Sequence, residues 1–230
     1  MQIKKFNLPD GAETEPMLAV DCSGSMGETA SPTESTKRYE VVTEAFATLI
    51  ERLEEIDSQA EEEEAEHAAG QDADEEDQGG VWTVAFNLQA HVLGDVNSDN
   101  LREKMREIPW GGGTKIVPAF NSLLSKYKKE FIDEAEIDPA TGQKKVPPYL
   151  LMLMVTDGEP ADEGEFEEVL ARAGGKIYVV MAVIGHGRQH DAAIRAYTRI
   201  SQSNDHIRVI PLNGTTDPNE LADALLGMVE

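Results

Sequence analysis

Five oxygen-bearing side chains, spread over three separate stretches of the chain, have the types and spacing that bind a hard cation. They are Asp21, Ser23, Ser25, Thr114 and Asp157. Two are acidic, three carry hydroxyls, and none offers nitrogen or sulfur. Small, hard divalent cations prefer such all-oxygen ligand sets. The sequence therefore predicts a divalent-ion site, with Mg²⁺ as the expected ion and Mn²⁺ or Ca²⁺ as alternatives.

The stretches around these residues predict how the fold brings them together. Asp21 directly follows the short apolar run 17–20, and Asp157 closely follows the longer run 150–155. Both runs are typical of buried strands of a parallel sheet. In open α/β sheets, ligands bind beyond the carboxyl ends of strands, where neighbouring crossovers diverge. The glycines 111–113 before Thr114 would let a third loop approach closely.

The rest of the chain alternates predicted strands with amphipathic helices, which favours one α/β domain over 1–230 with a doubly wound, mostly parallel sheet. A helical stripe runs from Tyr39 to Ile56. The short link between strands 81–86 and 90–93 favours an antiparallel pair. Asp217 before Pro218 is an expected N-cap. The remaining predicted elements are an edge strand at 3–6, strands at 177–184 and 207–210, and helices at 99–107, 116–131, 163–173, 191–200 and 218–229.

Two segments interrupt this alternation. The acidic segment 57–80 continues the first helix to about residue 70 and offers almost no apolar surface, so a mobile insert is expected there. The turn-rich segment 137–148 is an expected surface excursion.

Composition excludes several classes of partner. The chain has 230 residues and a net charge of -24, and the stretch Glu54–Asp77 alone holds 13 acidic residues. Such a charge repels nucleic acids and anionic membranes. Cys22 is the only cysteine, so no internal disulfide forms, and neither a signal-peptide pattern nor a membrane-spanning stretch is found. A cytoplasmic protein is expected.

The motifs resemble those of von Willebrand factor A (vWA) domains with a metal ion-dependent adhesion site (MIDAS). The pattern Asp-x-Ser-x-Ser is complete at Asp21, Ser23 and Ser25, while Thr114 and Asp157 match the family's Thr and its Asp in Thr-Asp-Gly. The resemblance implies a Rossmann-like sheet of six strands in the order 3-2-1-4-5-6, with strand 3 antiparallel and helices on both faces. It also implies that the hydroxyls contact the metal, that the aspartates often act through water, and that a partner's acidic side chain completes the shell. The chain is more similar to stand-alone intracellular members than to adhesion receptors.

The expected function is a metal-dependent module, not an enzyme, that captures an Asp or Glu of a protein partner. The alternative is a Mg²⁺-dependent phosphohydrolase using the same site. Such enzymes place a second carboxylate two residues after an aspartate nucleophile, and here Ser23 occupies that position.

Three further residue types have competing interpretations. Trp110 beside the glycine run is either a core residue or an exposed contact with the partner. His186 and His190 are expected to be solvated loop residues. Cys22 is expected to be a small buried thiol rather than a nucleophile.

Overall fold

The computed structural model describes residues 6–9, 11–67, 79–137 and 141–229. Its centre is a six-stranded sheet in the order β3-β2-β1-β4-β5-β6. Only β3 among these strands pairs antiparallel, against β2. The predicted strand order and the antiparallel edge are therefore confirmed. The strands are β1 (Thr14–Asp21), β2 (Val81–Phe86), β3 (Ala90–Val96), β4 (Tyr149–Thr156), β5 (Ile177–Gly185) and β6 (Ile207–Asn213).

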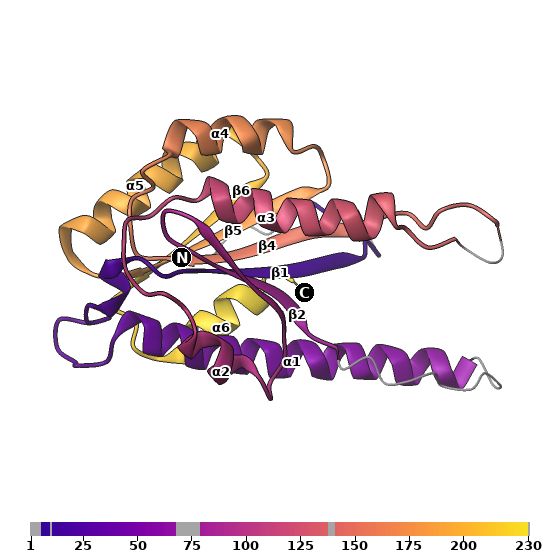
Figure 1. Cartoon of the computed structure of the whole chain (residues 1–230), viewed down its shortest axis with the longest axis horizontal. Coiled ribbons are helices and arrows are strands. Elements are labelled where there is room, and N and C mark those ends of the chain that lie inside the picture. The colour runs from indigo at the N-terminus through magenta and orange to yellow at the C-terminus, as the bar shows by residue number, and fades with distance from the viewer. Residues whose placement is uncertain (1–5, 10, 68–78, 138–140, 230) are drawn as a thin grey trace.

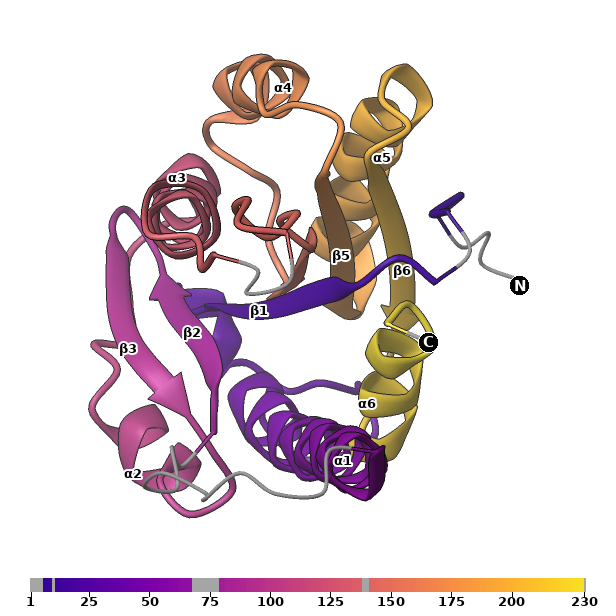
Figure 2. The ribbon, with the colours of Figure 1, turned by 90° about the vertical axis from the view of Figure 1, so that its right-hand side faces the viewer.

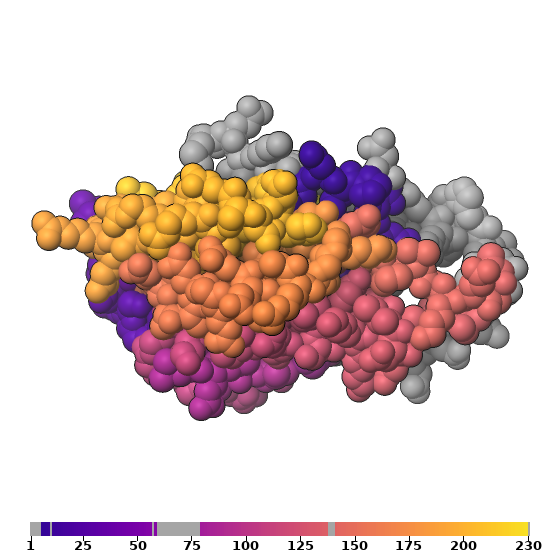
Figure 3. Space-filling model, turned by 90° about the horizontal axis from the view of Figure 1, so that it is seen from above, coloured from indigo at the N-terminus to yellow at the C-terminus, as the bar shows by residue number. Residues whose placement is uncertain are grey.

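Helices cover both faces of the sheet, so the molecule has three layers (Figures 1 and 2). One face carries α1 (Arg38–His67), α2 (Leu101–Arg106) and α6 (Pro218–Leu226). The other carries α3 (Val117–Lys128), α4 (Glu163–Arg172) and α5 (Gly187–Ser203), the layer seen from above in Figure 3. Two short turns complete the list, the 3₁₀ turn η1 (Gly24–Gly27) and the π-helical turn η2 (Lys129–Asp133). No described helix is long and apolar enough to cross a membrane.

The central strand β4 shows why an uninterrupted apolar run fits this position. Successive side chains of a strand point to opposite faces. Leu151 and Leu153 accordingly enter the core under α1 and α6, whereas Met152 and Met154 enter the core under α3 and α5. Because helices cover both faces, every residue from 150 to 155 must be apolar, and all of them are buried.

Helix α1 confirms the predicted stripe but extends well beyond it. Val42, Phe46, Leu49 and Leu53 are buried, while Ile56 is already 42% exposed. The helix nevertheless continues to residue 67. The remainder of the predicted acidic insert, 68–78, lies outside the described residues, as does most of the predicted strand at 3–6.

Asp217 caps α6 as predicted, with its carboxylate accepting from the backbone N–H of Asn219 at 2.9 Å. Helix α5, however, begins four residues before the predicted position 191, immediately after β5. The turn uses Gly187 at φ +80°, a conformation that glycine adopts readily. His190 therefore lies one turn inside the helix and is 1% exposed, so its prediction as a solvated loop residue is wrong.

Candidate metal centre

The five predicted site residues come together at the carboxyl ends of β1 and β4. These strands are parallel neighbours, with Val20 paired to Val155, so the residues that follow each strand emerge side by side. The Ser25 hydroxyl donates to Oδ1 of Asp157 at 2.7 Å, and the Thr114 hydroxyl donates to Oδ2 of Asp21 at 3.2 Å. The three stretches that carry the motif thus meet at one point.

Asp21 is the most buried of the five residues. It is fully buried, and its Oδ1 accepts the Ser23 backbone N–H at 2.7 Å, while Oδ2 accepts the Thr156 hydroxyl at 2.6 Å. Burial, and secondarily the negative charge of Asp157, raise the pKa of Asp21 to about 6. Two neighbouring carboxylates in a desolvated position favour a cation between or beside them.

The hydrogen-bond pattern fits a cation held by hydroxyl oxygens. Thr114 and Ser25 direct their protons to carboxylates, so each hydroxyl oxygen keeps at least one lone pair for a cation even though Ser25 also accepts from Ser23. Ser23 Oγ lies 3.1 Å from Ser25 Oγ and adds a third hydroxyl to the group. Within the described ranges, no group of three or more His, Cys, Asp or Glu side chains is placed to hold a metal. A metal at this point would therefore need the hydroxyl oxygens as ligands, and the carboxylates would hydrogen-bond to those hydroxyls.

Close approach of two loops builds the site, as the glycine run predicts. Gly111 and Gly112 adopt φ of +138° and +83°. Gly111 N–H donates to the Cys22 carbonyl at 2.7 Å, and Gly24 N–H donates to the Gly112 carbonyl at 3.1 Å. The loop carrying Thr114 is thereby fixed to the loop carrying the serines.

A buried carboxylate, that of Asp162, holds the Thr114 loop against the loop that follows β4. Asp162 accepts the backbone N–H groups of Ile116 and Val117 at 3.0 and 2.9 Å, and so caps the start of α3. In addition, the Ala161 N–H donates to the Thr114 carbonyl at 2.9 Å. These bonds connect the Thr114 loop with the segment that follows Asp157.

Two further residues take part in the site but are not predicted from the sequence. Thr156, the last residue of β4, donates to Asp21, and its only sequence signal is its place before Asp157. Arg38, the first residue of α1, is 3% exposed, and its Nη1 lies 2.5 Å from Oδ2 of Asp157. Nothing in the local sequence marks Arg38 as a site residue, because its contact with Asp157 spans 119 positions.

Trp110 lies at the rim of the site, neither fully buried in the core nor fully exposed. The indole is 36% exposed, and its other side packs on Tyr39 at a ring-centroid distance of 5.3 Å. Both rings border a hollow of about 360 Å³ that also reaches Ser23 and Gly24. Cys22 behind this rim is fully buried, and burial together with Asp21 raises its thiol pKa to about 12, so it stays protonated.

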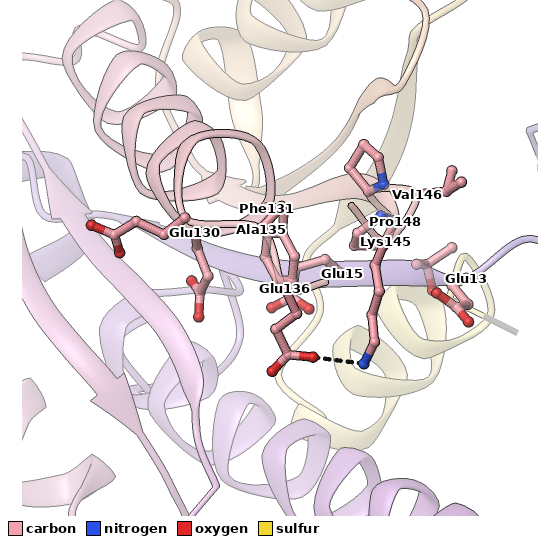
Figure 4. A pocket seen from close by; sticks show the side chains of 12 residues that line it. Glu13, Glu15, Glu130, Phe131, Ala135, Glu136, Lys145, Val146 and Pro148 are labelled. Carbon is pink, nitrogen blue, oxygen red and sulfur yellow. Dashed lines mark hydrogen bonds and ion pairs between the residues drawn. The ribbon is translucent and has the colours of Figure 1, made fainter. Parts of the chain in front are cut away.

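A separate hollow of about 500 Å³ lies at the opposite ends of the strands and includes none of the five predicted residues. Figure 4 shows its acidic lining, in which Glu136 pairs with Lys145 at 2.6 Å. The other glutamates around it are Glu13, Glu15, Glu130 and Glu134.

Comparison with known proteins identifies the fold. No family model matches the sequence, and no curated protein matches it. Among solved structures, the SpRpn10 VWA domain superposes with a TM-score of 0.57 at 10% identity, over 93% of this chain and 95% of that one. The chain has a von Willebrand factor A fold.

Two further solved structures also superpose on the chain. The D319A mutant of the PilB minor pilin from Streptococcus sanguinis gives a TM-score of 0.62 at 11% identity, over 97% of this chain. The chain spans only 62% of that pilin. An aerotolerance-related membrane protein from Bacteroides fragilis, carrying multiple mutations to serines, gives 0.56 at 17% identity, over 94% of this chain and 98% of that protein.

Proposed function

We propose that this vWA-fold chain is a metal-dependent protein-binding module that captures an acidic side chain of its partner. The observation that carries the proposal is the hydrogen-bond pattern in which Ser25 and Thr114 give their protons to Asp157 and Asp21. That pattern leaves neutral hydroxyl oxygens for a cation such as Mg²⁺. When bound, a divalent cation would supply a positively charged acceptor for one outside oxygen.

The chain's own residues divide the work. Ser23, Ser25 and Thr114 would hold the cation directly, and Asp21 and Asp157 would orient those hydroxyls and balance its charge. Direct protein ligands of this kind are neutral, so the cation would keep much of its charge. An Asp or Glu carboxylate of a partner protein is the expected outside ligand.

The rim supports a protein partner over a small anion. Trp110 and Tyr39 present aromatic surface beside Ser23 and Gly24, where a neighbouring apolar side chain of the partner would pack. Aromatic residues are enriched among the dominant contacts of protein interfaces.

Capture without catalysis is the better supported alternative. Ser23 occupies the position where a phosphohydrolase would carry its second carboxylate. The Cys22 thiol stays protonated with a pKa of about 12, which removes it as a nucleophile. His190 is buried in α5, and neither of its ring nitrogens has a hydrogen-bond partner among the described residues. Turnover of a generic phosphoester, lost in Asp21→Ala, would instead favour the hydrolase.

Calorimetric titration with Mg²⁺ tests the metal centre. The chain should show one-site binding, and Asp21→Ala should remove it, because two of the hydroxyl contacts described above depend on this carboxylate. Asp99→Ala, which alters an exposed aspartate before α2, is the matched control and should bind as the unaltered chain does. Unchanged binding in Asp21→Ala would refute the assignment.

A further inference from the structure

Arg38 is a buried cation in a position that disfavours one. It opens a 30-residue helix, where the helix dipole repels positive charge, and its side chain is only 3% exposed. A buried charge persists only when it is paired. The position therefore indicates a specific electrostatic partner.

That partner is the metal-centre carboxylate Asp157. Arg38 Nη1 lies 2.5 Å from its Oδ2 and also donates to the Ser25 carbonyl at 3.2 Å. A second carboxylate, that of Glu28, lies 3.3 Å from Nη2 but is 57% exposed, so water screens it. Arg38 Nε has no partner among the described residues.

The surrounding structure reserves space for the guanidinium. A Cβ at Gly185 would lie 3.0 Å from Arg38 Nε and 3.1 Å from Cζ. His190, also close to Arg38, is neutral near pH 7 because burial lowers its pKa. Two exposed residues of opposite charge, Glu159 and Arg188, also border the hollow beside Asp157. Arg38 is the buried positive charge that pairs with Asp157.

We propose that Arg38 sets the charge of the metal centre so that a bound divalent cation keeps a net positive charge and selects a carboxylate as its outside ligand. The inference rests on the proposed metal-dependent capture. The charges of Asp157 and Arg38 cancel, which leaves Asp21 as the uncompensated buried carboxylate beside the cation, whereas the nearby Glu28 and Glu159 are exposed to solvent. Without Arg38, the two carboxylates would neutralise a divalent ion completely.

The charge balance has a direct thermodynamic consequence. Arg38 weakens binding of the cation alone by repulsion and strengthens binding of the outside carboxylate to the loaded site. The metal and the carboxylate attract each other and so bind cooperatively, and Arg38 determines how tightly the outside carboxylate binds to the loaded site.

Two substitutions at Arg38 separate its charge from its hydrogen bonds. Arg38→Gln keeps an N–H donor without the charge, and Arg38→Lys keeps the charge. Calorimetry with Mg²⁺ should show affinity raised at least about tenfold in Arg38→Gln, because removing a unit charge near a divalent ion at an effective dielectric of about 20 has an effect of that order. Arg38→Lys should stay within about threefold of the unaltered chain.

Acetate serves as the carboxylate probe. Excess acetate, compared with chloride at equal ionic strength, should raise the Mg²⁺ affinity of the unaltered chain and raise that of Arg38→Gln distinctly less. This comparison measures how strongly acetate binds to the metal-loaded site, and a purely structural role of Arg38 would not change that binding.

A double variant keeps the inference testable if Arg38→Gln does not fold. Asp157→Asn should lower Mg²⁺ affinity, because Arg38 then stands unopposed. Asp157→Asn combined with Arg38→Gln restores the net charge and should bind at least about tenfold more tightly than Asp157→Asn alone. Circular dichroism reports folding of each variant.

The outcomes distinguish the inference from the proposed function. Absence of Mg²⁺ binding in the unaltered chain would overturn both. Mg²⁺ binding that Arg38→Gln leaves unchanged or weakens, or a double variant no better than Asp157→Asn, would overturn the role of Arg38 alone.

Discussion

The two buried carboxylates of the proposed metal centre differ in how their negative charges are compensated. Asp157 faces the Arg38 guanidinium, whereas the donors to Asp21 among the described residues are neutral hydroxyl and amide groups. Neutral donors compensate a buried negative charge incompletely, so burial raises the pKa of Asp21 to about 6. Asp21 is therefore the residue through which proton concentration acts on this site.

The raised pKa predicts how stability depends on pH in the metal-free protein. Asp21 titrates at about 6 when folded and near 3.9 when unfolded, so between these values the folded state binds more protons. Its contribution to the free energy of unfolding therefore falls as pH rises from about 4 through 6, by up to about 3 kcal/mol. Thermal unfolding of the unaltered chain and Asp21→Asn, compared at each pH, isolates this contribution.

The contribution should appear as a difference between the two proteins that changes from pH 4 to 7 and is constant outside that window. The proposed metal binding would require the ionised carboxylate of Asp21, so Mg²⁺ affinity should also drop as pH falls below about 6. A difference that stays flat across the window would show that Asp21 titrates normally.

The sequence predicts the candidate site residues that have a recognisable spacing, but not those that join the site only through tertiary contacts. Asp21, Ser23 and Ser25 stand in two-residue steps, so their motif is legible. Thr156 and Arg38 became site residues only through the pairing of β4 with β1 and the placement of α1. His190 was misjudged because its burial depends on where α5 begins.

At the scale of elements, the carboxyl ends of the strands position the site, and the absence of a side chain at Gly158 leaves space for Thr114. A Cβ at Gly158, in the loop after β4, would lie 2.7 Å from Thr114 Oγ1, closer than real contacts allow. The Thr114 hydroxyl must therefore move if residue 158 gains a side chain.

Gly158→Ala should weaken Mg²⁺ binding by roughly tenfold, as expected when a group that orients a metal ligand is disturbed. Gly164→Ala in α4 is the matched control, because its Cβ would meet nothing within 4 Å. The control should leave Mg²⁺ affinity unchanged and raise stability by up to about 1 kcal/mol, since alanine is the better helix former. Equal affinities in the two variants would mean that Thr114 adjusts without loss.

The element order was predictable because strand and helix patterns alternate clearly, and the strand order came from the family resemblance. Boundaries were less accurate. β1 begins at Thr14, three residues before its apolar run, because polar residues at its start still pair with β4. The helix predicted to reach residue 131 changes at Lys129 into a π-helical turn.

The C-terminal part of helix α1 is expected to contribute little to the stability of the fold. Its buried stripe finishes at Leu53, and Ile56 is already exposed. Deleting Glu61–Gln78 and rejoining the chain with a short Gly/Ser linker should therefore leave the melting temperature nearly unchanged, as thermal unfolding would show. A drop of many degrees would mean that the segment packs on the body.

At the scale of the whole molecule, a large group of described acidic residues lies far from the proposed metal centre. β1 runs toward the site and α1 runs back, so the acidic end of α1 projects from the opposite end of the molecule (Figure 1). The glutamate-lined hollow of Figure 4 borders the starts of β1 and β4 at this same end. The net charge of -24 therefore overstates the negative potential at the site.

The dependence of Mg²⁺ affinity on salt concentration should distinguish the effect of these distant charges from the effect of charges inside the site. A helix of 30 residues is about 45 Å long, whereas the Debye length is about 8 Å at physiological ionic strength and about 30 Å in 0.01 M salt. Deleting Glu61–Gln78 removes ten carboxylates. The deletion should weaken Mg²⁺ binding only at low salt, and its affinity should converge with that of the unaltered chain as salt rises.

Asp157→Asn provides the contrast, because it changes a charge inside the site, where salt screens little. Its loss of Mg²⁺ affinity should persist from low to physiological ionic strength in the same calorimetric series. If the deletion still lowers affinity at physiological salt, the acidic segment acts on the metal centre directly. In that case the acidic segment would also repel an acidic protein partner at the metal site. The comparison therefore also decides whether the net charge of the chain limits which proteins can bind there.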